Sequence, residues 1–215
     1  MGYTTILFDM DGTLMNTLED MADSVNAILR QLGHAERSLD EVRAFVGNGA
    51  EMLVRRAMPD GSSEAEIAQA LGLYQPYYAA HCQEKTRAYD GILPLLEELH
   101  RAGKQIAVVS NKPEGALRTL CDEYFAGLVK VVSGDMPGRR RKPWPDMVDA
   151  ALEKMSADRN DAVYVGDSEV DVQTGKNAGL PVIGVSWGFR GREKLIEAGA
   201  ETIVDSIEEL RQKLL

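Results

Sequence analysis

The sequence predicts a doubly wound α/β fold, in which helices cover both faces of a parallel sheet. Short apolar and β-branched runs alternate along the chain with stretches of helical period, which is typical of βαβ units. The runs contain few polar residues, as expected for strands buried on both faces. We expect strands at residues 4–9, 105–110, 128–133, 162–166, 181–185 and 202–204, and helices at residues 92–102, 114–125, 145–155 and 170–178.

One long segment interrupts this alternation. Between residues 15 and 88 the pattern is helical throughout, broken by glycines and by a Pro59-Asp60-Gly61 turn. We therefore expect residues 1–14 and 89–215 to form an α/β catalytic core, and residues 15–88 to form a helical cap inserted after the first strand. Its two connections are expected to act as hinges over the carboxyl edge of the sheet, so that the cap serves as a lid.

The composition favours an intracellular protein and disfavours polyanionic partners. The formal net charge of −10 disfavours attraction to nucleic acid or to an anionic membrane. The basic run from Arg139 to Lys142 is interpreted as a solvated loop. No apolar run approaches the ~20 residues of a membrane span, and the first residues do not resemble a signal peptide. Two cysteines, Cys82 and Cys121, favour the reducing cytoplasm, while the oligomeric state cannot be predicted.

The strongest chemical signal follows the first expected strand, in the run from Phe8 to Leu14. Asp9 and Asp11 are two residues apart, so they point to the same side of an extended chain. Ligands of open α/β sheets bind at the carboxyl ends of the strands. Gly12 then allows a sharp turn and a close approach of the backbone to an anion.

Two weaker signals lie further along the chain. Ser110 and Asn111 end another expected strand with groups that donate hydrogen bonds to phosphate oxygens, although such a pair is equally common in turns and caps. Lys142 precedes a proline ahead of an expected helix and carries a charge suited to a carboxylate and a phosphoryl group.

The fourth signal is an acidic turn after the strand at residues 162–166. Asp167 ends that strand, and Asp171 follows four residues later on the next helix, where it can face the same site. Mg²⁺ prefers carboxylate and carbonyl oxygens together with water, and Asp9 and Asp167 would supply the carboxylates. The alternative is that these acids favour the helix N-terminus electrostatically.

Taken together and in this order, the four signals resemble the four motifs of the haloacid dehalogenase superfamily, and the resemblance spans essentially the whole chain. The position of the helical insertion is similar to that in the subclass with a helical cap after the first motif. Within it, the runs Phe45 to Gly49 and Leu53 to Ala57 are similar to the cap of bacterial phosphoglycolate phosphatases.

The resemblance implies roles for individual residues. Asp9 would attack phosphorus and form an aspartyl-phosphate, and Asp11 would act as general acid and then base, with a raised pKa in the closed site. Ser110 and Lys142 would hold the transferring phosphoryl group, with help from Gly12, Thr13 and Asn111. Mg²⁺ would be bound by Asp9, the Asp11 carbonyl and Asp167, with support from Asp171.

The implied substrate is a small phosphorylated metabolite, with 2-phosphoglycolate as the best choice. The amides of the Gly47-Asn48-Gly49 loop and a cap arginine, Arg55 or Arg43, are candidate contacts for its anionic groups, and the alternative for both arginines is a solvated helix face. Departures from the family pattern at Asn16 and Asp90 concern the hinges more than the chemistry. A sugar phosphomutase of the β-phosphoglucomutase type and a pyrophosphatase remain alternatives on the same fold, and a non-catalytic phosphoryl-binding regulator is the alternative of another class.

Overall fold

The computed structural model of the protein describes residues 2–215 and divides the chain into two compact units. One unit runs up to Met15 and resumes with Ala88–Leu215, and the other is Asn16–Arg87. The chain passes between them through two very short strands, β2 (Met15–Asn16) and β3 (Arg87–Ala88), which pair with each other. Neither strand was predicted, because two residues are too few to carry a hydrophobic alternation.

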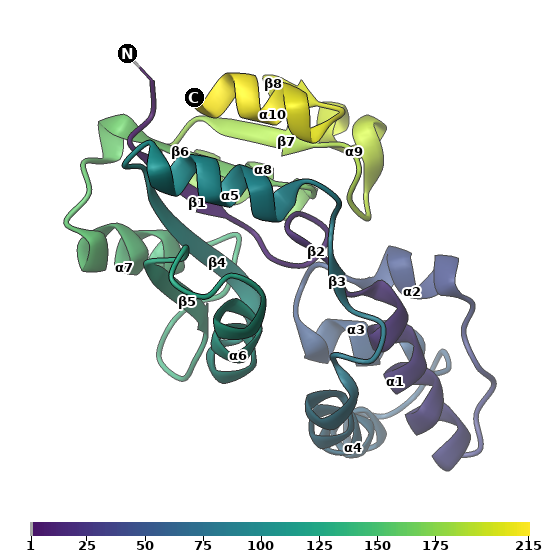
Figure 1. Ribbon diagram of the computed structural model, residues 1–215. Coiled ribbons are helices and arrows are strands. Elements are labelled where there is room, and N and C mark those ends of the chain that lie inside the picture. The colour runs from purple at the N-terminus through teal and green to yellow at the C-terminus, as the bar shows by residue number, and fades with distance from the viewer. Residues whose placement is uncertain (1) are drawn as a thin grey trace. The chain divides into compact units, whose positions relative to one another are not determined.

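The larger unit contains a six-stranded parallel sheet with the order β5-β4-β1-β6-β7-β8 (Figure 1). The predicted doubly wound fold is confirmed. The strands are β1 (Thr5–Phe8), β4 (Gln105–Pro113), β5 (Val131–Asp135), β6 (Ala162–Gly166), β7 (Val182–Val185) and β8 (Thr202–Val204). β1 lies between β4 and β6, so its carboxyl end is at the centre of the sheet edge.

Two strands differ from the prediction at their ends. β4 continues from Ser110 to Pro113 through an irregularity in its pairing with β5, which starts after Val109. β5 begins at Val131, three residues later than expected. Ser110, Asn111 and Lys112 of β4 are buried, and hydropathy alone does not distinguish buried polar residues from a loop.

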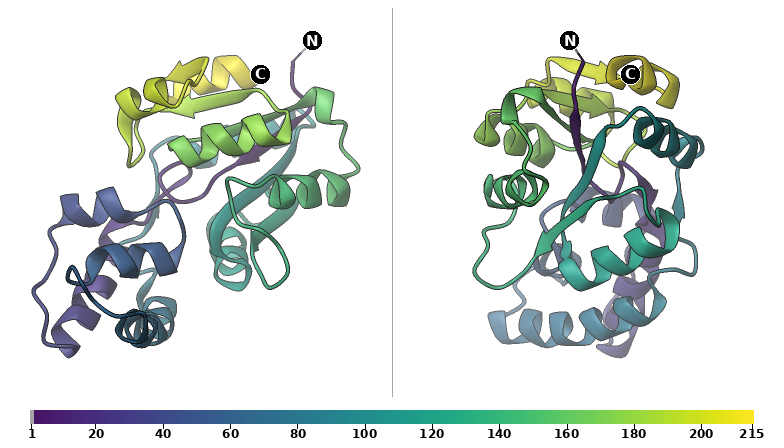
Figure 2. Two further views of the ribbon diagram at one scale, coloured as in Figure 1. Left: turned by 180° about the vertical axis from the view of Figure 1, so that it is seen from behind. Right: turned by 60° about the vertical axis from the view of Figure 1, so that its left-hand side comes forward.

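Helices cover both faces of the sheet and create two separate apolar cores. The first core is formed with α5 (Ile92–Arg101), α6 (Glu114–Tyr124) and α10 (Ile207–Leu214). The second involves α7 (Asp146–Met155) and α8 (Glu169–Ala178), which are seen from behind in Figure 2. The unit also contains the 3₁₀ turn η1 (Arg159–Asp161) and α9 (Gly191–Glu197). All of β1 is buried, because it packs against both cores.

The smaller unit consists of four helices: α1 (Leu18–Gln31), α2 (Leu39–Phe45), α3 (Ala50–Ala57) and α4 (Glu64–His81). Capping boxes start α2 at Ser38 and α4 at Ser63. The buried carboxylate of Asp20 accepts hydrogen bonds from the backbone N–H groups of Lys85 and Thr86, at 2.8 to 3.1 Å. Asp20 therefore fixes the start of α1 against the segment that leads into β3.

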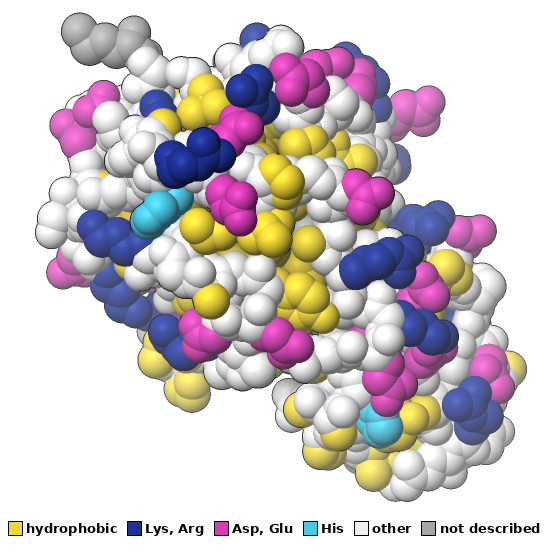
Figure 3. Space-filling view, in the orientation of Figure 1, with side chains coloured by type: hydrophobic (Ala, Val, Ile, Leu, Met, Phe, Trp, Pro, Cys, Tyr) yellow, Lys and Arg dark blue, Asp and Glu magenta, His cyan; other side chains and the backbone are white. Residues whose placement is uncertain are grey.

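Positive and negative side chains are interspersed on the face shown in Figure 3. The arginines of the basic run are each paired with an acid: Arg139 with Glu114, Arg140 with Asp146 and Arg141 with Asp135. Arg140 also lies over the exposed ring of Trp144, at 4.4 Å from its centroid. Among residues 2–215, no helix is both long and apolar enough to cross a membrane.

Candidate active site

Asp9 follows β1 directly and lies at the centre of the carboxyl edge of the sheet. Its side chain is buried, and the Nζ of Lys142 lies 2.8 Å from its Oδ1. That oxygen accepts no well-directed hydrogen bond from the described residues. A buried carboxylate oxygen with an ion-pair contact and no directed donor retains capacity for a further positive ligand.

Lys142 is held in place at both its backbone and its side chain. The Lys142 N–H donates to Asn111 Oδ1 at 2.8 Å, and Asn111 Nδ2 donates to the Lys142 carbonyl at 3.3 Å. The buried ammonium also contacts Asp171 Oδ1 at 2.7 Å and the Tyr164 hydroxyl at 3.2 Å. The amide of Asn111, predicted to bind phosphate, thus holds the lysine-bearing segment.

Asp167 lies in a space that two glycines leave open. A Cβ on Gly12 would be 2.5 Å from Asp167 Oδ2, and a Cβ on Gly188 would overlap the Asp167 side chain. The carboxylate accepts hydrogen bonds from the Phe189 N–H at 2.7 Å and from the Thr13 hydroxyl at 3.2 Å. Thr13, a predicted phosphate contact, therefore orients Asp167 in this structure.

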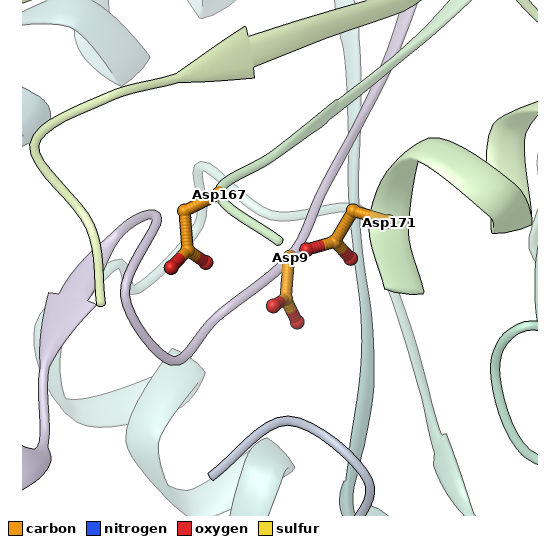
Figure 4. A group of neighbouring side chains, drawn as sticks. All are labelled: Asp9, Asp167 and Asp171. Atoms are coloured by element: carbon orange, nitrogen blue, oxygen red, sulfur yellow. The ribbon is translucent and has the colours of Figure 1, made fainter. Parts of the chain in front are cut away.

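Asp171 reaches the same place from the first turn of α8, and Figure 4 shows its carboxylate directed toward Asp9. Oδ1 receives hydrogen bonds from Lys142 and from the Tyr164 hydroxyl, the latter at 3.1 Å. Oδ2 receives bonds from the N–H and the hydroxyl of Ser168. Both oxygens of Asp171 are therefore already engaged by protein groups.

These charges shift one another strongly. Burial, reinforced by Asp171, raises the pKa of Asp9 to about 7, although Lys142 opposes the shift. Burial and the neighbouring Asp171 and Asp9 also raise the pKa of Asp167 well above its ordinary value. Burial alone would lower the pKa of Lys142, but Asp171 and Asp9 outweigh it and hold the pKa well above its usual range, so the ammonium stays charged.

The donor set of this cluster suits a divalent cation. Asp9, Asp167 and Asp171 each offer a carboxylate oxygen, and these oxygens lie within 4.8 Å of one another. Lys142 pairs with two of the three buried carboxylates, Asp9 and Asp171, so the cluster contains more acidic than basic groups, and a hard cation would compensate the difference. Asp9 Oδ1, which accepts no well-directed hydrogen bond from the described residues, is an oxygen suited to such a ligand.

Asp11 pairs with a lysine that the sequence did not single out. The Nζ of Lys112 lies 3.2 Å from Asp11 Oδ1, and the Lys112 side chain is only 3% exposed. Its backbone N–H donates to the Ser110 hydroxyl at 3.3 Å. Ser110 and Lys112 lie in the part of β4 where the pairing with β5 is irregular. A single lysine after Ser-Asn gives no sequence signal that would identify Lys112 as a site residue.

The remaining predicted residues belong to the helical unit. Arg55 makes a two-pronged ion pair with Glu64 and a longer contact with Glu51, so its charge is satisfied within that unit. Arg43 pairs with Asp40 on the surface.

The loop containing Gly47 and Asn48 is held by Arg56, which is not among the predicted site residues. Arg56 donates to the Phe45 carbonyl at 2.7 Å and to Asn48 Oδ1 at 2.9 Å.

The fold and the cluster together define a doubly wound α/β enzyme core with an ionised site at its ligand-binding edge. A family model for the haloacid dehalogenase-like hydrolases matches residues 6–185. The chain belongs to this family, as the resemblance of its four motifs predicted.

Named relatives and solved structures agree with this assignment. Phosphoglycolate phosphatase of Pseudomonas syringae pv. syringae is 34% identical over 213 residues, covering 95% of this chain and 77% of the relative. A crystal structure from Lactobacillus delbrueckii subsp. bulgaricus, provisionally assigned as a phosphoglycolate phosphatase, has a TM-score of 0.95 and 35% identity, covering 100% of this chain and 99% of the other. CbbY from Rhodobacter sphaeroides in complex with phosphate has a TM-score of 0.80 and 27% identity, covering 97% and 96%.

Proposed function

We propose that the protein is a Mg²⁺-dependent phosphomonoester hydrolase that uses Asp9 as a transiently phosphorylated nucleophile. The observation that carries this proposal is the arrangement around Asp9: a buried carboxylate 2.8 Å from Lys142, beside Asp167 and Asp171, at the carboxyl edge of the sheet. Such a carboxylate can attack phosphorus only if the repulsion between two anions is offset, and the lysine and a cation would offset it.

The reaction consists of two displacements. An Asp9 oxygen attacks phosphorus, the bond from phosphorus to the ester oxygen breaks, and Asp11 protonates the leaving oxygen. Water then attacks phosphorus while Asp11 takes a proton from that water; the bond between phosphorus and the Asp9 oxygen breaks, which regenerates the carboxylate, and inorganic phosphate leaves. Lys142 stabilises the charge on the transferring group, with Ser110 and the backbone at Gly12 as further donors.

The residues proposed to hold Mg²⁺ are Asp9, Asp167 and the Asp11 backbone carbonyl. When bound, the ion would neutralise charge on the phosphoryl oxygens and on the nucleophile. Asp171 contributes its charge and orients Lys142, since its two oxygens already carry hydrogen bonds from Lys142, Tyr164 and Ser168.

For the substrate we propose a small phosphorylated metabolite, with 2-phosphoglycolate first. The names of the relatives in Pseudomonas support this choice. The helical unit, Asn16–Arg87, is proposed as the cap that selects the substrate, through the loop at Gly47 and Asn48 and through its arginines. A cytoplasmic location completes the proposal.

The proposal is tested by phosphate release from a panel of esters, with Mg²⁺ or with EDTA. The panel contains 2-phosphoglycolate, sugar phosphates, nucleoside monophosphates and pyrophosphate. The variants are Asp9→Asn and Asp122→Asn, the latter making the same chemical change at an exposed position of α6.

Metal-dependent release by the wild type and by Asp122→Asn, lost in Asp9→Asn, is the expected result. A sugar phosphate that is isomerised without phosphate release would identify a phosphomutase instead. Stable phosphorylation of Asp9 without turnover would point to a regulatory protein, and preferred cleavage of pyrophosphate to a pyrophosphatase.

A further inference from the structure

Lys112 is a buried cation that the proposed reaction does not use. It lies on the irregular end of β4, and its ammonium forms an ion pair with Asp11, whose side chain is 14% exposed. Taking an ammonium out of water is costly, so a buried lysine needs a negative partner close by. In this structure the ion pair with Asp11 provides that partner, at 3.2 Å.

The two buried lysines of the site have different surroundings. Lys142 contacts Asp9 and Asp171, so its charge lies beside the nucleophile and the transferring phosphoryl group. Lys112 contacts Asp11, so its charge lies beside the group proposed to protonate the leaving oxygen. The second cation is therefore placed toward the part of the substrate that departs.

We propose that Lys112 determines specificity by binding a carboxylate on the leaving group. This inference rests on the proposed function, and it identifies the preferred substrates as short phosphate esters with an anionic leaving group. In 2-phosphoglycolate the carboxylate carbon is two bonds from the ester oxygen. Asp11 is proposed to meet the ester oxygen, and the ammonium of Lys112 lies 3.2 Å from Asp11. The ammonium is therefore close enough to bind the substrate carboxylate.

Binding of this kind exchanges one ion pair for another. The substrate carboxylate takes the place of Asp11 as the partner of Lys112, and Asp11 turns to the ester oxygen with a proton taken from solvent. A neutral leaving group offers Lys112 no new ion pair and gains nothing from its charge. The residue thus distinguishes the two kinds of ester by charge.

The test compares two esters of equal length, 2-phosphoglycolate and 2-hydroxyethyl phosphate, in which a hydroxymethyl group replaces the carboxylate. The variants are Lys112→Met, which removes the charge, and Lys112→Arg, which keeps it. Lys130→Met is the matched control at an exposed position before β5. Circular dichroism confirms that each variant is folded.

The wild type is expected to prefer 2-phosphoglycolate. In Lys112→Met, kcat/KM for this ester should fall about 10- to 100-fold, mainly through KM, as expected for the loss of a charge-assisted hydrogen bond. For 2-hydroxyethyl phosphate the fall should be clearly smaller, so that the preference for the anionic ester is lost, and Lys112→Arg should retain most of the preference. Lys130→Met should behave as the wild type.

A second measurement needs no variant. Glycolate should inhibit wild-type hydrolysis of 2-hydroxyethyl phosphate, whereas ethylene glycol at the same concentration should not. The inference is overturned if glycolate does not inhibit or if the wild type has no preference for the anionic ester. It is also overturned if Lys112→Met lowers kcat/KM equally for both esters.

Failure of the proposed function gives a different result. If the wild type releases phosphate from no ester, or if Asp9→Asn still does so, the phosphatase assignment fails and this inference fails with it. If only the discrimination between the two esters is missing, the phosphatase assignment stands and Lys112 has another role.

Discussion

Replacing Asp9, the proposed nucleophile, with asparagine is expected to stabilise the metal-free protein. Burial raises the pKa of Asp9 from 3.8 to about 7, so keeping this group ionised in the folded state opposes folding. At about 1.4 kcal/mol for each pH unit, the penalty approaches about 4 kcal/mol above pH 7. Asn has the same shape and carries no charge, so Asp9→Asn removes the penalty.

The sign of the pH dependence follows from the direction of the shift. Well below pH 3.8 Asp9 is protonated in both the folded and the unfolded protein and contributes nothing. As the pH rises toward 7, the unfolded state ionises first, and the wild type loses stability relative to the variant. The difference in free energy of unfolding should therefore grow from about 2 kcal/mol near pH 5 to about 4 kcal/mol near pH 8.

Urea denaturation in EDTA across this pH range, followed by circular dichroism, measures the difference. Asp122→Asn is the control and should track the wild type. Saturating Mg²⁺ should stabilise the wild type more than Asp9→Asn, because the cation compensates the charge that the variant lacks. The reasoning is refuted if Asp9→Asn is no more stable than the wild type near pH 8, or if the difference does not change with pH.

Three further outcomes are expected. Gly188→Ala should destabilise the protein by about 1–3 kcal/mol and weaken Mg²⁺ binding, measured by calorimetry, since the new Cβ meets Asp167; unchanged affinity would contradict this. Asp20→Ala should lower the free energy of unfolding by about 1–3 kcal/mol in urea titrations, because the N–H groups of Lys85 and Thr86 lose their buried acceptor; an unaltered midpoint would argue against that role. Removing divalent cations with EDTA should abolish phosphate release, and Mg²⁺ should restore it; full activity in EDTA would exclude the metal role.

The sheet could be predicted because its strands are buried on both faces. β1 and β6 are continuous apolar runs, and such runs give a clear signal. The end of β4 could not be predicted, because Ser110, Asn111 and Lys112 are buried polar residues whose pattern matches that of a turn. Their burial depends on Asp11 and Lys142, which come from distant parts of the chain.

The central part of the site could be predicted for a topological reason. The carboxyl ends of neighbouring parallel strands meet at one edge, so polar residues after β1 and β6 were expected to converge, and Asp9 and Asp167 do so. The residues that orient them were not predictable. Gly188 matters because a Cβ would meet Asp167, and Tyr164 because of its contact with Lys142; neither relation is encoded by sequence spacing.

The Tyr164 hydroxyl also links the charged groups to the strands of the sheet. It lies on β6, 3.3 Å from the Val109 carbonyl on β4, although β1 separates these two strands. The same oxygen contacts Lys142 and Asp171. A substitution that shifts β4 relative to β6 would therefore also disturb the charged groups around Asp9.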